Sequence, residues 1–461
     1  MVYQGVINIF SNPFSILLIA IGTVIGIIFG AIPGLTASLA IVIFLPFTYS
    51  MEASQGISTL TALYIGGISG GLISAILLNI PGTPSSVATC FDGRPMANKG
   101  QAAKALGVGV VFSFLGTLFG IVCLIVLAPK LADVALKFGP FEYCSLSIFA
   151  LSLVISLSGK DVTKGLMSCA LGCIIATVGL APLDSKPRFT FGNINLTTGF
   201  KLLPVLIGIF AVTEVVNYAR EVRHQKKFEV SDVKIKGFGF TLSEFIGQLK
   251  NAFVSALVGL GIGILPGIGG SVSNMLAYTT SKNLSKYPEK YGTGIIDGVV
   301  ASETANNATI GGAMIPLLAL GIPGDGTSAV LMGGFMIHGI SVGPLIFQKS
   351  GDIVYAIFFS MLLASFFMMI FMLLGMRAFI KVLKIPKEFL LSLVIILCII
   401  GAIGDSNIYF DAWGVLVFGL IAYFMTRMDF PMTPLILGFL LGKTIESNLR
   451  RASQLMSTTS P

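Results

Sequence analysis

Four Pro-Gly pairs in an otherwise apolar chain are each followed by side chains that can bind an anion. The pairs are Pro33-Gly34, Pro81-Gly82, Pro266-Gly267 and Pro323-Gly324. A helix that begins just after such a pair exposes unpaired backbone N–H groups, and its dipole favours negative charge. Hydroxyl and amide side chains beside these groups can hold carboxylate oxygens. The candidate substrate-binding residues are Thr36, Ser38, Asn79, Gly82, Thr83, Ser85, Ser86, Ser271, Asn274, Gly324, Thr327 and Ser328. For each residue taken singly, the alternative is that small side chains only let helices approach closely.

A second group of polar residues can hold a cation. Glu303 precedes Asn306 and Asn307 and opens a strongly apolar segment, and Asp325 directly follows the last Pro-Gly pair. A carboxylate inside a membrane is costly, so it is by default a candidate for function. Glu303 either helps to hold a coupling sodium ion or proton, or lies at a helix start that the dipole stabilises. We take these four residues as candidate coupling-ion residues, and we expect no cofactor and no metal beyond a sodium ion.

The elements that must position these residues are broken helices in two matched sets. Each half of the chain has a first Pro-Gly pair and then a longer motif, Leu78-Asn79-Ile80-Pro81-Gly82 in one half and Leu320-Gly321-Ile322-Pro323-Gly324 in the other. Non-helical backbone persists at membrane depth only where it is buried in protein or lines a cavity. Paired breaks at corresponding positions therefore predict discontinuous helices from two internal repeats, with the binding site between them.

The composition is typical of a membrane protein. Only 11% of residues are charged, 54% are hydrophobic, and the mean hydropathy is +0.91. An ordinary soluble domain has about 25% charged residues. Since a helix needs about 20 apolar residues to cross a bilayer, the chain has room for roughly 12 to 14 membrane segments. We therefore expect an all-α, polytopic protein embedded in a lipid bilayer.

Basic residues in the loops predict how the two repeats are oriented. The loop around Ser54, between the two breaks of the first repeat, has no Lys or Arg, whereas the corresponding loop around Lys286 is basic. Basic loops face the cytoplasm, so the repeats should have inverted topology. We expect 1–219 to form the first transmembrane repeat, 220–250 a basic cytoplasmic linker and 251–461 the second repeat. The loops near Lys99, Lys226, Lys286 and Lys384 and the pair Arg450-Arg451 should be cytoplasmic, and those near Ser54 and Ser341 should face outward.

Several classes of function are disfavoured by residues that the chain lacks. Six Cys and two His occur without a Cys-x-x-Cys pair or a zinc-ligand spacing. No nucleophile–base arrangement and no phosphate-binding loop of the Walker type is present, so we do not expect an enzyme. The net charge of +8 is concentrated in loops, which indicates membrane orientation rather than a nucleic-acid partner. A channel or passive facilitator for small solutes is the alternative, although it explains neither the inverted copies nor the paired breaks.

Two longer motifs resemble the large membrane subunit of the tripartite tricarboxylate transporters. They are Asp92-Gly93-Arg94-Pro95-Met96-Ala97, followed by Lys99-Gly100-Gln101-Ala102, and Ser302-Glu303-Thr304-Ala305-Asn306-Asn307-Ala308, followed by Ile315-Pro316-Leu317-Leu318. The resemblance extends from about Gly30 to Arg451 and implies a multi-pass permease of the bacterial inner membrane. Such a permease works with a small membrane subunit and a periplasmic substrate-binding protein. It imports carboxylates, a tricarboxylate such as citrate or dicarboxylates, by ion-coupled alternating access. Asp325 departs from the family pattern, in which a small residue is more usual.

Overall fold

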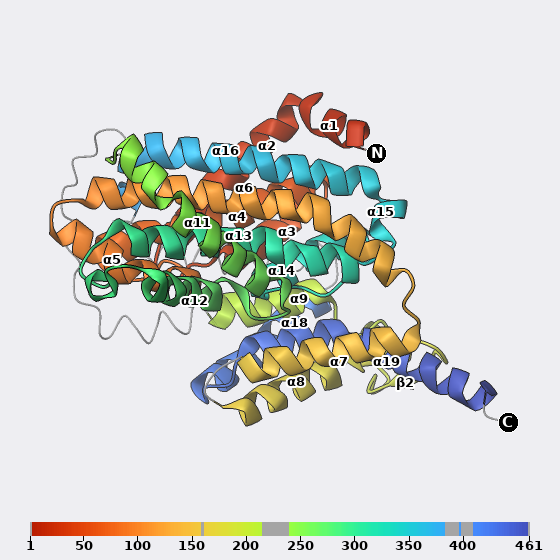
Figure 1. Ribbon diagram of the computed structural model, residues 1–461. Coiled ribbons are helices and arrows are strands. Elements are labelled where there is room, and N and C mark those ends of the chain that lie inside the picture. Colours follow the sequence, from red (N-terminus) through yellow and green to blue (C-terminus); the bar gives the residue numbers. More distant parts are fainter. Residues whose placement is uncertain (1, 158–160, 214–238, 383–395, 398–408, 460–461) are drawn as a thin grey trace.

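The computed structural model describes residues 2–157, 161–213, 239–382, 396–397 and 409–459 (Figure 1). These residues are mostly helical. Six helices among them are long and apolar enough to cross a membrane: Pro13–Ala31, Ala53–Leu78, Ala102–Ala135, Leu242–Ile264, Gly351–Phe379 and Tyr409–Arg427. The expected all-α, polytopic membrane protein is therefore confirmed, while the expected total of roughly 12 to 14 membrane segments stays a prediction.

Two sets of helices form the main bundle. The first set is α1 (Val2–Phe10), α2 (Pro13–Ala31), α3 (Ala37–Thr48), α4 (Ala53–Leu78), the 3-10 turn η1 (Pro84–Ser86), α5 (Val87–Asn98) and α6 (Ala102–Ala135). The second set is α11 (Leu242–Ile264), α12 (Gly269–Leu284), the turn η5 (Pro288–Lys290), α13 (Ile296–Leu320), α14 (Gly326–Ile337), α15 (Ile346–Lys349) and α16 (Gly351–Val382). The start of α11 at Leu242 means that residues 242–250, assigned above to the linker, form its first turns.

The helices of both sets break at corresponding places. The Pro33-Gly34 pair lies between α2 and α3, and the Pro266-Gly267 pair lies between α11 and α12. The other two pairs separate α4 from η1 and α13 from α14. Proline lacks a backbone donor and disfavours helical geometry in the residue before it, so each break follows from the local sequence.

Glycines let the broken helices pack backbone against backbone. A Cβ on Gly82 would lie 2.1 Å from the carbonyl oxygen of Gly30, and a Cβ on Gly324 would lie 2.5 Å from that of Gly263. Neither position can therefore carry a side chain without moving the backbone. In each set, the second break thus packs against the end of the helix before the first break. Gly82 packs against α2, and Gly324 packs against α11.

The centre of the bundle is formed by α4 and α13. α13 packs against α6 and α11, and α4 packs against α2 and α16. Nearly every residue from Gly298 to Ala319 of α13 is buried, although this helix carries Ser, Thr, Asn and Glu side chains. Because polar and ionisable groups are costly in lipid, such a helix is stable only where other helices surround it.

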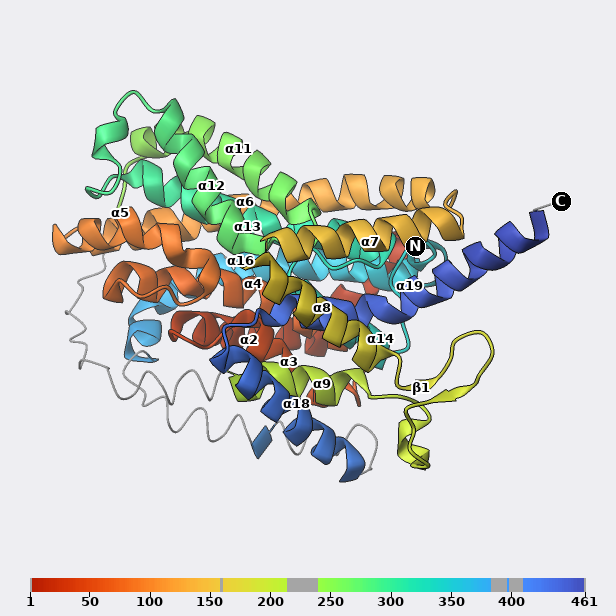
Figure 2. The same cartoon turned by 90° about the horizontal axis from the view of Figure 1, so that it is seen from below.

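A second layer lies along one side of this bundle (Figures 1 and 2). It consists of α7 (Pro140–Leu157), α8 (Val162–Ala176), α9 (Leu202–Ile207) with the π-helical segment Gly208–Val212, α18 (Tyr409–Arg427) and α19 (Met432–Thr459). Between α8 and α9 the strands β1 (Gly179–Leu180) and β2 (Pro187–Arg188) pair antiparallel, and the 3-10 turn η2 (Ile194–Leu196) follows. α19 packs against both α7 and α8.

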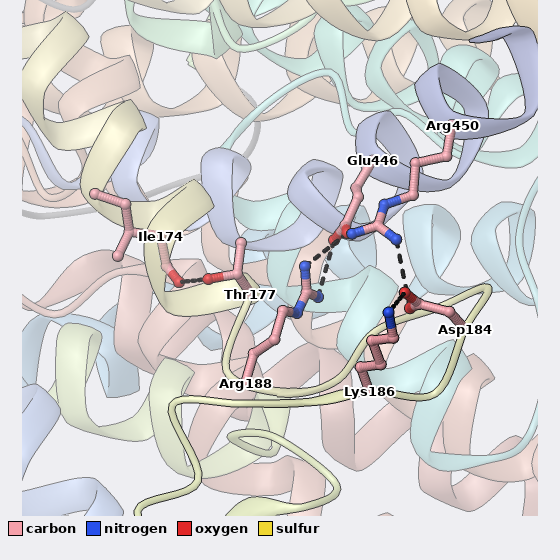
Figure 3. A network of polar contacts seen from close by, with 7 residues as sticks. All are labelled: Ile174, Thr177, Asp184, Lys186, Arg188, Glu446 and Arg450. Atoms are coloured by element: carbon pink, nitrogen blue, oxygen red, sulfur yellow. Dashed lines mark hydrogen bonds and ion pairs between the residues drawn. The ribbon is translucent and has the colours of Figure 1, made fainter.

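Ion pairs fasten the β1–β2 hairpin to α19 (Figure 3). Arg188 donates from both terminal nitrogens to the carboxylate of Glu446, at 2.7 and 3.0 Å. Arg450 contacts the same carboxylate at 2.8 Å and Asp184 at 3.4 Å. The end of α19 lies opposite to α5 in both views. The expectation that Arg450-Arg451 faces the cytoplasm stays a prediction, and Arg450 is held at the hairpin by Glu446 and Asp184.

At one end of the bundle, the loop between α3 and α4 meets the loop after α14. The ring Nε2 of His338 lies 3.3 Å from Thr48 Oγ1, and a Cβ on Gly56 would lie 2.5 Å from the same nitrogen. Burial lowers the pKa of His338, so the ring is neutral in this contact at pH 7. This end therefore contains the loops around Ser54 and Ser341.

At the other end, α5 meets the loop that leads into α13. Asp92 is fully buried, and its Oδ1 accepts the backbone N–H groups of Gly292, Gly294 and Ile295 at 3.0, 2.7 and 3.1 Å. Its Oδ2 accepts the hydroxyl of Tyr278 at 2.8 Å. The loops near Lys99 and Lys286 thus lie together and away from the His338 end, while Lys226 and Lys384 lie outside the described residues.

Candidate functional site

The starts of the broken helices from both sets meet inside the bundle. The hydroxyl oxygens of Ser38 in α3 and Thr327 in α14 lie 2.8 Å apart. In the complementary pairing, a Cβ on Gly270 in the first turn of α12 would lie 2.8 Å from the Cβ of Ser85 in η1. Each contact joins a helix start of one set to a helix start of the other. The structure thus brings together the hydroxyl residues that follow the breaks.

One part of this region, the amide cluster, consists of Asn306, Thr83, Ser85 and Gly270. Asn306 is 1% exposed, and neither Oδ1 nor Nδ2 of its side chain has a hydrogen-bond partner among the described residues. A Cβ on Gly270 would lie 2.7 Å from its Oδ1, so the amide lies against the first turn of α12. The hydroxyls of Thr83 and Ser85 lie 3.0 Å apart. Since buried amides are almost always paired, the Asn306 side chain is suited to bind a polar ligand.

The neighbouring part, the carboxylate cluster, consists of Asp325, Tyr64 and Ser328. Tyr64 donates its hydroxyl to Asp325 Oδ2 at 2.6 Å. The backbone N–H of Ser328 donates to Asp325 Oδ1 at 2.6 Å, which caps the start of α14. A Cβ on Gly269 would lie 3.0 Å from that of Asp325, so this cluster contacts the residue directly before Gly270 of the amide cluster.

Glu303 forms a third group, the glutamate cluster, with Thr89, Ser113 and Asn307. Its carboxylate is fully buried and accepts the hydroxyls of Thr89 at 2.5 Å and Ser113 at 3.0 Å. The Asn307 amide nitrogen lies 3.5 Å from the same carboxylate. No ion pair reaches Glu303 within the described part of the chain. α13 begins at Ile296, about two turns earlier, so the interpretation of Glu303 as a helix-start residue is wrong.

Asn307 differs from Asn306 because its amide is fully used. Its nitrogen donates to the backbone carbonyl of Glu303 at 3.0 Å. Its oxygen accepts the hydroxyls of Ser69 at 2.6 Å and Thr117 at 3.4 Å. Asn307 therefore joins α13 to α4 and α6 beside Glu303, and it holds the glutamate cluster in place.

Several other predicted residues have local structural roles. Thr36 caps α3 by accepting the N–H of Leu39 at 3.2 Å. Asn79 is exposed and ends α4 in the left-handed conformation, with φ of 59°. Ser86 completes a capping box with Thr83, and Gly82 and Gly324 allow the close backbone contacts described above. These contacts account for the residues without a ligand.

The two predicted residues of α12 behave differently from each other. Asn274 accepts the N–H of Ala88 at 2.7 Å and donates to the carbonyl of Ser302 at 3.3 Å, so it ties α12 to α5 and α13. Ser271 is half-buried in the first turn of α12, beside Gly270 of the amide cluster. Ser271 therefore remains close enough to the amide cluster to contribute to it.

The sequence analysis missed the partners of the buried carboxylates. Tyr64 and Ser113 lie in the interiors of α4 and α6, far from any break, and Thr89 lies in the first turn of α5, beyond the hydroxyl residues chosen after Pro81-Gly82. One signal was available for Tyr64, because it precedes Gly82 by the same number of residues as Asn306 precedes Gly324. Aligning the two sets on their Pro-Gly pairs would therefore have placed Tyr64 opposite Asn306.

Comparison with known proteins identifies the family. The model of the tripartite tricarboxylate transporter TctA family matches residues 16–437. An uncharacterized 52.8 kDa protein in the TAR-I ttuC' 3' region of Agrobacterium vitis is 33% identical over 441 residues, which are 96% of this chain and 87% of that protein. An uncharacterized protein in the TAR-II ttuC' 3' region of the same organism is 36% identical over 191 residues, 41% of this chain and 79% of that protein. No solved structure matches.

The family match covers the main bundle except α1 and the first residues of α2, with all four breaks, and most of the second layer. It agrees with the resemblance drawn from the motifs around Asp92 and Glu303, and with the apolar helices that make this a multi-pass membrane protein. The chain is thus a component of a transporter and not an enzyme, and it belongs to the TctA family of the tripartite tricarboxylate transporters.

Proposed function

We propose that this protein imports carboxylates by ion-coupled alternating access, with the substrate bound at the amide cluster between the broken helices. The observation that carries the proposal is the Asn306 side chain, which is buried without a partner where helix starts of both sets meet. Helix N-termini favour negative charge, and the hydroxyls of Thr83 and Ser85 add donors for carboxylate oxygens. A substrate carboxylate would accept hydrogen bonds from Nδ2 of Asn306 and from these hydroxyls.

Inverted-topology repeats are part of the proposal. The corresponding loops of the two sets support it, because the α3–α4 loop lies at the His338 end whereas the α12–α13 loop lies at the Asp92 end. The basic residues near Lys99 and Lys286 favour a cytoplasmic location for the Asp92 end. In this arrangement the protein lies in the bacterial inner membrane, and the His338 end faces the periplasm.

The coupling ion belongs to the glutamate cluster in this proposal. Glu303 is a buried carboxylate among neutral hydroxyl and amide groups, so its charge must be offset by a bound sodium ion or removed by a proton. The proposed partners of this protein are a small membrane subunit and a periplasmic substrate-binding protein, in keeping with the tripartite family. The binding protein would deliver its carboxylate at the His338 end.

Uptake by the assembled transporter in proteoliposomes tests the substrate site. Asn306→Ala removes hydrogen bonds to a charged group, so carboxylate affinity should fall by about 10- to 150-fold, equivalent to about 1.5–3 kcal/mol. The control is Ser168→Ala, since Ser168 is also buried without a partner but lies in α8. Wild-type affinity in Asn306→Ala would contradict the assignment of the substrate site to this cluster. Flux that neither saturates nor needs an ion gradient would indicate a channel.

A further inference from the structure

The amide and carboxylate clusters occupy equivalent positions in the two sets of helices. Thr83 and Asp325 each follow the second Pro-Gly pair of their set, and each forms a capping box with the residue three positions later. Tyr64 on α4 and Asn306 on α13 each lie eighteen residues before the glycine of that pair. The two clusters therefore occupy equivalent places in the two sets but carry different side chains. We call them half-sites, one at Thr83 and one at Asp325.

The half-site at Asp325 already contains a carboxylate. One of its oxygens accepts the Tyr64 hydroxyl and the other accepts the N–H of Ser328 at the start of α14, both at 2.6 Å. A helix start and a neutral donor are the groups that would bind the carboxylate of a ligand. Asp325 is 7% exposed, and no ion pair joins it to a Lys or Arg among the described residues.

The half-site at Thr83 has the complementary character. Its capping residue is a neutral threonine, and the position equivalent to Tyr64 is the unpartnered amide of Asn306. The half-sites adjoin, because Gly269 contacts Asp325 and the next residue, Gly270, contacts Asn306 and Ser85. A carboxylate bound at Asn306 would therefore lie beside the fixed negative charge of Asp325.

We propose that Asp325 is a built-in carboxylate that fills one half-site, so that the substrate places one carboxylate in the other half-site and trianionic substrates are disfavoured. This inference rests on the proposed function and specifies its substrate class. Like charges a few ångströms apart repel, and this repulsion is strong where water is excluded. A dicarboxylate can direct its second carboxylate away from Asp325, whereas a tricarboxylate has fewer arrangements that avoid it. Asp325 is then a selectivity residue rather than a ligand of the coupling ion.

Variants that change the charge and keep the helix cap test this inference. Asp325→Thr copies the residue of the equivalent half-site, and Asp325→Asn keeps the shape of the side chain, and both residue types cap helices well. Competition of citrate and succinate for uptake should be measured with the complete transporter in proteoliposomes. Both variants should improve the affinity for citrate relative to succinate by about tenfold or more. Thermal unfolding checks that each variant is folded.

The reciprocal variant is Thr83→Asp, which places a second fixed carboxylate in the half-site at Thr83 with its capping box retained. It should abolish uptake of both substrates while the protein stays folded. The inference is overturned if the citrate-to-succinate ratio does not change in the Asp325 variants, or if both substrates weaken together and uptake requires more sodium, since Asp325 would then hold the cation. A wild-type protein that transports neither substrate would instead overturn the proposed function.

Discussion

At the scale of single residues, the buried carboxylates differ in the groups that compensate them. Asp92 accepts three backbone N–H groups and a phenol, so its charge is stabilised by fixed donors. Glu303 has two hydroxyls and an amide nitrogen at 3.5 Å. A carboxylate that strong donors hold serves structure, whereas one with weak neutral donors can exchange a cation or a proton.

Neutralising Glu303 should uncouple transport from the ion gradient. Glu303→Gln keeps the size of the side chain but replaces one accepting oxygen with a donating amide and removes the charge that a sodium ion or proton offsets. We expect substrate to bind while its accumulation no longer responds to imposed sodium or proton gradients. Uptake into proteoliposomes under each gradient measures the response.

Asp92→Asn is the matched control for this prediction, because Asp92 is equally buried. It should lower the free energy of unfolding by about 1–3 kcal/mol, through weaker bonds to the loop before α13, and leave the ion dependence intact. An unchanged gradient response in Glu303→Gln would contradict the assignment of the coupling ion to this carboxylate.

Part of the site could be predicted from sequence because breaks concentrate exposed backbone groups. Ser38, Ser85 and Thr327 follow Pro-Gly pairs, and the structure pairs Ser38 with Thr327 and places Ser85 against Gly270 of the other set. Tyr64 could not be singled out, because a tyrosine inside an apolar helix is indistinguishable from an ordinary core residue. Its role depends on Asp325, which is far away in the sequence and approaches it only through the packing of α14 against α4.

At the scale of elements, the sequence located the breaks correctly but left open where one helix, α13, begins. Pro and Gly interrupt helices by local chemistry, so all four breaks were predictable. The start of α13 was not, because its first turns contain polar residues such as Asp297 and Ser302 that resemble a loop in a hydropathy pattern. Those residues are helical because α5, α6 and α12 pack around them.

Adding a methyl group at Gly82 or Gly324, the glycines of the second break in each set, should disrupt the fold. Gly82→Ala and Gly324→Ala each direct a Cβ at a backbone carbonyl, at 2.1 and 2.5 Å. We expect each to lower stability by about 1–3 kcal/mol or to prevent folding. Thermal unfolding in detergent measures the effect.

Gly261→Ala is the control for these variants, because no atom of a neighbouring residue lies within 4 Å of its Cβ position on α11. Since alanine is the better helix former, this variant should be neutral or more stable by about 0.5–1 kcal/mol. If all three variants had the same stability, backbone-to-backbone packing would not be what holds the breaks in place.

At the scale of the whole molecule, the loops divide between two ends in the pattern that the charges predicted. The loops around Ser54 and Ser341 lie at the His338 end, and those around Lys99 and Lys286 lie at the Asp92 end. The position of the second layer could not be predicted, because no motif marks it. Its ion pairs around Glu446 join Arg188 of the hairpin and Arg450 of α19 to one carboxylate.

Labelling of introduced cysteines should reveal the two faces. Exposed positions are available in all four loops, at Glu52, Lys99, Lys286 and Ser341. In spheroplasts, a membrane-impermeant maleimide should modify cysteine at positions 52 and 341 and should reach positions 99 and 286 only after the membrane is permeabilised. The variants are made in a protein without native cysteines. Labelling of positions 52 and 286 from the same side would exclude inverted repeats.

The hydrogen bonds that Asp92 accepts also make the two ends of the molecule unequal in how strongly their helices are held together. A motion that parted α5 from the loop before α13 would break three backbone bonds to a charged group, each worth about 1.5–3 kcal/mol. Parting α3 from α14 breaks two neutral bonds, Ser38–Thr327 inside the bundle and Thr48–His338 at the other end, each worth about 0.5–1.5 kcal/mol. The population of a state falls exponentially with its free energy. The two sets of helices therefore need not open equally often at the two ends of the bundle, although their breaks correspond. In the alternating access proposed above, Asp92 would favour the state in which its own end is closed.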